Sequence, residues 1–188
     1  MNILIAEDEA ITRLGLRSLL ADLGHTVVAS VADGASALRL ACELRPDLAL
    51  LDIRMPGLDG LEVARGIAER CPLPVVMLTA YSERDLVARA AATPSVQAYL
   101  VKPVRAGELG SVLELAAARF QEWQALRREV ANLEDALAAR DAVAQAKIVL
   151  MERQGMTERD AFLDIQARAR RERRTMREVA GDILSETP

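Results

Sequence analysis

The chain has few of the residues on which several functional classes depend. Its 188 residues include one tryptophan, two tyrosines, two phenylalanines, two cysteines and one histidine. So few aromatic residues argue against an aromatic stacking platform for nucleic-acid bases. The lone histidine, His25, has no catalytic companion in the sequence. The two cysteines, Cys42 and Cys71, have neither metal-site nor redox-motif spacing, so we expect both to be reduced structural thiols.

Long apolar runs are also missing. No segment approaches the roughly 20 apolar residues that span a bilayer, and no charged-then-apolar leader opens the chain. We therefore expect no membrane partner and a cytoplasmic protein. The formal net charge of −4 is mildly acidic and does not by itself indicate a nucleic-acid partner. With 51% hydrophobic residues, the chain has enough material for one full domain and a small second one.

Short apolar runs are present instead, and they have the length of β-strands. They are mostly continuous rather than alternating, as expected of strands buried on both faces of a parallel sheet. Helical patterns separate them, the clearest being Leu16, Leu19, Leu20 and Leu23. This βαβα order predicts an α/β fold with a doubly wound, five-stranded parallel sheet. The five runs are 2–6, 26–29, 47–51, 74–78 and 96–101.

Polar residues directly follow four of these runs: Glu7 with Asp8, then Asp52, Thr79 and Lys102. In doubly wound sheets, ligands bind beyond the carboxyl ends of the strands, which meet at one edge. The sequence therefore predicts that these five residues form one site.

The chemistry of this site follows from its charges. Three neighbouring carboxylates repel one another unless a hard cation such as Mg²⁺ or Mn²⁺ lies among them. Asp52 is then a nucleophile for a phosphoryl group, whose oxygens Lys102 neutralises and Thr79 contacts. A phosphohydrolase is a weaker alternative, because it requires a second carboxylate just beyond the nucleophile, where this chain has Arg54. We expect no turnover of external substrates.

These residues stand in longer motifs, namely Leu50-Leu-Asp-Ile-Arg-Met-Pro-Gly-Leu-Asp-Gly60, Leu78-Thr-Ala80 and Tyr99-Leu-Val-Lys-Pro103. Together they resemble the receiver domain of bacterial two-component response regulators, over residues 1–118. The resemblance implies that a sensor histidine kinase phosphorylates Asp52, and that Thr79 and Tyr99 form a switch pair. It also implies a cis Lys102-Pro103 bond and a metal site made by Glu7, Asp8, Asp52 and the backbone carbonyl of Arg54.

Two positions depart from the usual pattern. Arg54 and Tyr81 lie two residues beyond Asp52 and Thr79, where similar receivers flank the path of hydrolytic water. We predict that these large side chains set the lifetime of the phosphorylated form.

The segment from Ser111 to Gln154 contains neither glycine nor proline, so it predicts a helix of up to roughly 66 Å. A heptad stripe within it predicts a dimer seam, and hence a homodimer when the protein is phosphorylated. Packing of this stripe on its own chain is the alternative. We assign 119–139 as a helical linker or short coiled coil. The seam residues are Trp123, Leu126, Val130, Leu133 and Leu137.

After Gly155 the pattern predicts two further short helices, and hence a three-helix domain over 140–188. Thr157 and Thr175 are placed to cap them. Phe162 is expected on the inner face of the first, with Ala161, Ile165 and Ala169.

This C-terminal pattern resembles the ANTAR domain of transcription antitermination regulators, over about 125–185. The motif comprises Arg140, Val143, Ala146-Lys147, Leu150-Met151, Thr157-Glu158, Ala161-Phe162 and Val179-Ala180. The resemblance implies binding to RNA stem-loops of leader transcripts and control of termination or translation. A DNA-binding regulator is the alternative function. The arginines could also form an ordinary solvated helix face that binds no nucleic acid. The candidate RNA-binding residues are Arg140, Lys147, Arg168, Arg170, Arg171, Arg173 and Arg174.

Overall fold

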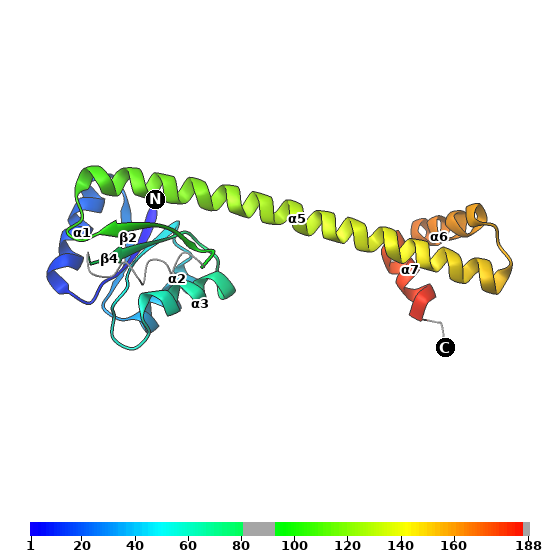
Figure 1. Cartoon of the computed structure of the whole chain (residues 1–188), viewed down its shortest axis with the longest axis horizontal. Helices are drawn as coiled ribbons and strands as arrows, with labels where there is room; N and C mark the ends of the chain where they lie inside the picture. Colours follow the sequence, from blue (N-terminus) through cyan, green and yellow to red (C-terminus); the bar gives the residue numbers. More distant parts are fainter. Residues whose placement is uncertain (81–92, 186–188) are drawn as a thin grey trace. The chain divides into compact units, whose positions relative to one another are not determined.

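The computed structural model describes residues 1–80 and 93–185 of the chain, which forms two compact units, Met1–Gln124 and Ala125–Pro188 (Figure 1). Helix α5 (Ala106–Gln154) runs through the division without a break, as the lack of glycine and proline from Ser111 to Gln154 predicted. A separate linker over 119–139 stays a prediction.

The first unit is built on five parallel strands in the order β2-β1-β3-β4-β5, which confirms the predicted fold class. Every residue of β3 and β4 is buried, which explains their continuous apolar sequences. The bounds are β1 Asn2–Ala6, β2 Thr26–Val31, β3 Leu48–Asp52, β4 Val75–Thr79 and β5 Val96–Val101.

Helices cover both faces of this sheet. One core cluster joins the sheet to α2 (Gly34–Leu44) and α3 (Gly60–Arg70), and the other joins it to α1 (Ala10–Asp22) and the first turns of α5. A capping box between Asp59 and Glu62 fixes the start of α3. Gly60 allows this helix to approach β3 closely, because a Cβ atom at that position would overlap the carbonyl oxygen of Asp52.

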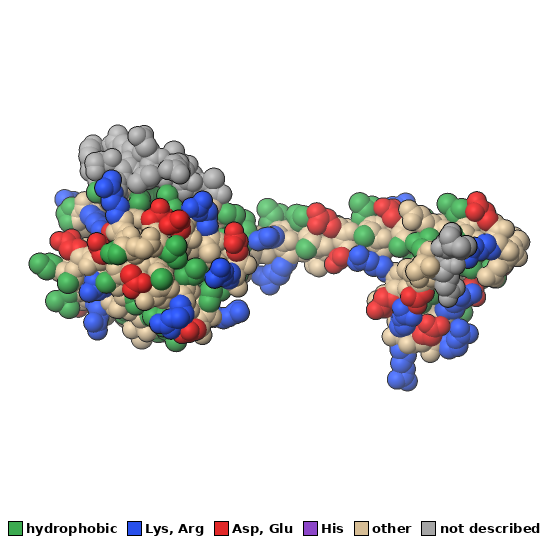
Figure 2. All heavy atoms as spheres, turned by 90° about the horizontal axis from the view of Figure 1, so that it is seen from below, with side chains coloured by type: hydrophobic (Ala, Val, Ile, Leu, Met, Phe, Trp, Pro, Cys, Tyr) green, Lys and Arg blue, Asp and Glu red, His purple; other side chains and the backbone are tan. Residues whose placement is uncertain are grey.

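The second unit packs the end of α5 against α6 (Glu158–Glu172) and α7 (Met176–Ser185). Cationic and anionic side chains are mixed over its visible face (Figure 2). Its core excludes Phe162, whose side chain is 40% exposed, so the expectation that this residue is buried was wrong. The core residues are Ala146, Leu150, Ala161, Ile165, Ala169, Val179, Ala180 and Ile183. Among the residues described in both units, no helix is both long enough and apolar enough to cross a membrane.

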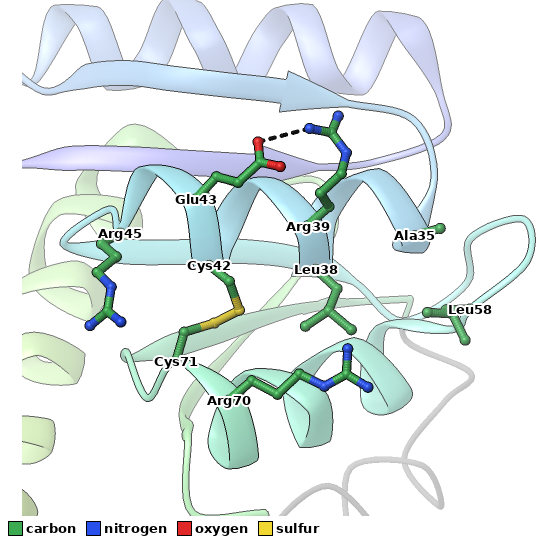
Figure 3. A pocket seen from close by; sticks show the side chains of 9 residues that line it. All are labelled: Ala35, Leu38, Arg39, Cys42, Glu43, Arg45, Leu58, Arg70 and Cys71. Atoms are coloured by element: carbon green, nitrogen blue, oxygen red, sulfur yellow. Dashed lines mark hydrogen bonds and ion pairs between the residues drawn. A yellow bond between two sulfur atoms is a disulfide. The ribbon is translucent and has the colours of Figure 1, made fainter.

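The two cysteines are joined, which corrects the expectation of reduced thiols. Cys42 near the end of α2 and Cys71 at the end of α3 form a disulfide, with their Cα atoms 5.3 Å apart (Figure 3). Their separation of 29 residues gave no sign of this pairing. The contact exists because α2 and α3 pack together on the same face of the sheet.

Candidate functional site

Three carboxylates meet at the carboxyl ends of β1 and β3. These strands are paired so that Ala6 lies opposite Leu51, and the next residues along each chain, Glu7 and Asp52, therefore emerge side by side. Together with Asp8, they place one carboxylate oxygen each within 4.8 Å of the others. Glu7 is fully buried and Asp52 is 5% exposed, whereas Asp8 is exposed. The buried pair is screened only weakly by water, so its charges need a nearby cation.

Lys102 supplies a positive charge to this cluster. Its Nζ lies 2.6 Å from Oε2 of Glu7 and 2.9 Å from Oδ1 of Asp52. The backbone amide of Lys102 donates to the carbonyl oxygen of Thr79, and the following peptide bond to Pro103 is cis, as the motif implied. The backbone of β4 and β5 therefore holds the ammonium between the two buried carboxylates.

The burial of the cluster shifts the protonation of its groups. Desolvation raises the pKa of Glu7 and of Asp52, and the hydrogen bonds to Lys102 offset this only in part. Repulsion between Asp52 and Glu7, and between Asp8 and Asp52, raises these pKa values further. Burial alone lowers the pKa of Lys102, but its contacts with Glu7 and Asp52 outweigh that effect and raise it.

These groups fit a hard divalent cation. The three nearby ligand atoms are all carboxylate oxygens, which Mg²⁺ and Mn²⁺ prefer, and Asp8 opens to solvent that can complete the coordination with water. A cation also removes the repulsion that raises the pKa values of Glu7 and Asp52. Arg54 lies two residues beyond the end of β3, and its side chain is exposed.

Two other predicted residues lie on the neighbouring strands. Thr79 ends β4, is 3% exposed, and donates through Oγ1 to the carbonyl oxygen of Ala80 at 3.1 Å. Tyr99 lies in β5, pairs in register with Met77, and is half-buried, and this burial raises the pKa of its phenol. Tyr81 lies outside the described residues.

Arg13 also supports the acidic site, although the sequence did not reveal this role. From α1, its Nη1 donates to the carbonyl oxygens of Glu7 at 2.6 Å and Asp8 at 3.2 Å. These bonds fix the backbone of the loop that carries both carboxylates. No motif could indicate this, because a single arginine on a helix is usually a solvated charge.

In the second unit, two of the predicted cationic residues border a groove of about 490 Å³. Arg140 and Lys147 come from α5, and exposed Phe162 lines the groove from α6. Lys147 forms an ion pair with Glu158 at 2.6 Å. The remaining lining is small or apolar: Ala139, Val143, Ala144 and Met176.

The predicted arginines of α6 and its end are not equally available. Arg168 pairs with Asp164 at 2.8 Å, Arg174 with Asp182 at 2.5 Å, and Arg171 with Glu172 at 3.4 Å. Within residues 1–80 and 93–185, Arg140, Arg170 and Arg173 have no acidic partner.

The predicted seam is an exposed apolar stripe on α5. Leu126, Val130, Leu133 and Leu137 are 62%, 46%, 64% and 59% exposed. Trp123, by contrast, stacks on Phe120 with the ring centroids 5.4 Å apart.

Comparisons with known proteins agree with both units. The response regulator receiver domain model matches residues 3–114, and the ANTAR domain model matches residues 131–184. Over 182 residues the chain is 44% identical to the transcriptional regulatory protein PdtaR of Mycobacterium tuberculosis, covering 97% of this chain and 88% of that protein.

Solved receiver domains share the fold of the first unit. The receiver domain of a modulated diguanylate cyclase from Desulfovibrio desulfuricans is 36% identical with a TM-score of 0.60, covering 64% of this chain and 95% of that one. The receiver domain of a sensor histidine kinase from Pseudomonas aeruginosa is 31% identical with a TM-score of 0.54, covering 62% of this chain and 97% of that one. That structure has a magnesium ion coordinated in its active-site cleft. The chain belongs to the response regulators that join a receiver domain to an ANTAR domain.

Proposed function

We propose that this response regulator is controlled by phosphorylation, binds RNA stem-loops through its C-terminal unit, and regulates transcription termination or translation of the bound transcripts. The observation that carries the RNA assignment is the groove that brings Arg140 and Lys147 together beside the exposed ring of Phe162. Sequencing the RNA that co-purifies with the phosphorylated protein tests the RNA assignment. Stem-loops should be enriched over bulk RNA, whereas recovery of DNA instead would favour a DNA-binding regulator.

Asp52 is the proposed phosphoacceptor. Its carboxylate oxygen forms a bond to phosphorus while the phosphorus–nitrogen bond of a kinase phosphohistidine breaks and the released imidazole takes a proton. Lys102 stabilises the transferred oxygens, and Thr79 offers its hydroxyl to them. Asp52→Asn should accept no label from a small phosphodonor, whereas Asp47→Asn, directly before the start of the same strand, should be labelled normally.

Glu7, Asp8, Asp52 and the Arg54 carbonyl are the proposed ligands of Mg²⁺, which neutralises charge on the phosphoryl group when bound. Titration with Mn²⁺, followed by its paramagnetic effect on water relaxation, measures the site directly. Asp8→Asn should weaken Mn²⁺ binding, and Asp22→Asn, at the end of α1, should leave it unchanged.

A sensor histidine kinase is the proposed phosphodonor, and α1 offers a surface for it. Ile11 and Leu14 are 81% and 67% exposed on the helix that directly follows the acidic loop. Ile11→Asp should keep phosphorylation by a small donor but lose transfer from the kinase, because only the kinase needs the docking surface. Equal loss with both donors would contradict this.

Thr79 and Tyr99 are the proposed switch, and Arg54 with Tyr81 the determinants of lifetime. Replacing Arg54 and Tyr81 by alanine should change the dephosphorylation rate several-fold, about 1 kcal/mol in the barrier. An unchanged rate would dismiss this role.

For RNA binding, we propose that an unpaired loop base stacks on Phe162 while Arg140 and Lys147 contact its phosphates. The phosphate then replaces Glu158 as the partner of Lys147. Lys147→Ala should weaken hairpin binding and flatten its salt dependence by about one unit of log–log slope. Arg159→Ala, which removes an equal charge outside the groove, should have a smaller effect.

A substitution of Glu158 should have the opposite effect on RNA binding. Glu158→Gln should strengthen hairpin binding, because it removes the anion that competes with phosphate for Lys147. Unchanged affinity in both Lys147→Ala and Glu158→Gln would move the RNA site elsewhere.

Pairing of two chains along the exposed stripe of α5 is proposed for the phosphorylated form. Two ANTAR units held together can bind two loops with a gain in effective concentration. Leu133→Lys should therefore keep the phosphorylated protein monomeric by light scattering and weaken two-loop binding more than one-loop binding. Asn132→Lys adds the same charge off the stripe and should do neither.

A further inference from the structure

The disulfide borders a pocket on the receiver whose lining includes none of the residues assigned above. Cys42 and Cys71 both line this pocket, whose volume is about 470 Å³ (Figure 3). Cys71 is 4% exposed, whereas Cys42 is partly exposed and is the more accessible of the two residues. A volume of this size accommodates a small molecule rather than a protein segment.

The pocket carries excess positive charge. Arg39, Arg45 and Arg70 line it, and Glu43 is the only acidic residue among the described residues of its lining. Arg39 forms an ion pair with Glu43 at 2.8 Å (Figure 3). Across the part of the chain that the structure describes, Arg45 and Arg70 have no acidic partner. An anion that enters beside the disulfide therefore meets two guanidinium groups available to bind carboxylates.

We propose that this pocket is a thiol–disulfide exchange site for a low-molecular-weight thiol that carries carboxylates. The arginines of the pocket would bind the carboxylates of such a molecule, and the disulfide would react with its thiol. The assignment rests on the receiver fold alone and is independent of RNA binding.

The exchange proceeds in two balanced steps. The thiolate sulfur of the ligand attacks Sγ of Cys42, a new disulfide forms between them, and the Cys42–Cys71 bond breaks with its electron pair on Sγ of Cys71, which takes a proton from water. A second thiolate then attacks the ligand sulfur of this mixed disulfide. It releases the oxidised ligand dimer and leaves Cys42 as a thiolate, so the protein gains two electrons and the two ligand molecules lose them.

The site lies at one end of a helix whose other end contacts the aspartate. Helix α3 begins at Gly60, packed on the backbone of Asp52, and its C-terminal cap is Cys71. Exchange therefore removes the covalent link between the far end of α3 and α2.

The test compares two thiols of nearly equal size on the oxidised full-length protein: glutathione, and its diethyl ester, in which both carboxylates are masked. Intact-mass spectrometry after acid quenching follows the mixed disulfide, and peptide mapping locates it. Rates are compared at equal thiolate concentration. Glutathione should react about tenfold faster, as expected for electrostatic steering, and its advantage should shrink as salt is added. The adduct should be on Cys42.

Variants separate the pocket from general charge. Arg45→Gln and Arg70→Gln should each reduce the advantage of glutathione over its ester, whereas Arg65→Gln, on α3 outside the pocket, should preserve it. Equal rates for the two thiols on the wild-type protein would overturn the proposal without any variant. An adduct on Cys71 alone, or reduction only by a dithiol protein, would overturn it as well.

Discussion

Replacing Lys102 by methionine removes the cation that touches two buried carboxylates, with a side chain of similar length. At an effective dielectric constant of about 20, contacts of 2.6 and 2.9 Å each correspond to about 6 kcal/mol of Coulomb energy. Most of this is offset by the desolvation of Lys102 itself, which the variant no longer suffers. We expect a net loss of about 3 kcal/mol in the free energy of unfolding without Mg²⁺ at neutral pH.

The loss should depend on pH in a defined direction. Glu7 and Asp52 have raised pKa values in the folded protein, and removing Lys102 raises them further. A carboxyl group with a raised folded pKa binds more protons folded than unfolded, so its protonation favours folding at low pH. Stability should therefore fall as the pH rises from the ordinary values of 3.8 and 4.5 through the raised ones, and acidification should recover part of the loss.

Urea denaturation in the presence of EDTA measures the free energy of unfolding at each pH. The chain has a single tryptophan, Trp123, which stacks on Phe120 in the first unit, so its fluorescence reports on that unit. Lys147→Met is the matched control, and its unfolding is followed by circular dichroism. The ion pair of Lys147 with Glu158 is also 2.6 Å long, but Glu158 is far more exposed than Glu7 or Asp52. We therefore expect a much smaller loss of unfolding free energy in this variant. Equal losses in the two variants, or a Lys102→Met loss that does not shrink at low pH, would refute the reasoning.

Three further predictions follow from the same structure. Mg²⁺ should bind more tightly as the pH rises through the raised pKa values of Glu7 and Asp52, with proton release detectable by calorimetry in buffers of different ionisation enthalpy. Gly60→Ala should cost about 2 kcal/mol or more, because its Cβ overlaps the backbone of β3, whereas Gly181→Ala, with open space around it, should stabilise α7 by up to about 1 kcal/mol. A reductant should lower the receiver's unfolding free energy by about 3.5 kcal/mol, the loop-closure value for a separation of 29 residues, and should have no such effect on Cys42→Ala.

Much of the receiver could be predicted from the sequence, because its information is local. Continuous apolar runs specify strands that are buried on both faces, and the connecting helices require the strands to be parallel. Parallel strands end at one edge, so a polar residue directly after each run is placed at the same edge. For this reason the sequence alone assigns Glu7, Asp52 and Lys102 to one cluster.

Other features depended on packing that no local pattern encodes. The Cys42–Cys71 bond required α2 and α3 to lie side by side on one face, a consequence of topology across 29 residues. Phe162 follows a buried alanine on α6, and only the rotation of that helix against α5 decides that Ala161 and Ile165 turn inward while Phe162 lines the groove. The sequence thus determined which residues could form strands and where charge would gather, whereas the tertiary structure decided which surfaces meet, because contact between distant segments is set by packing rather than by spacing.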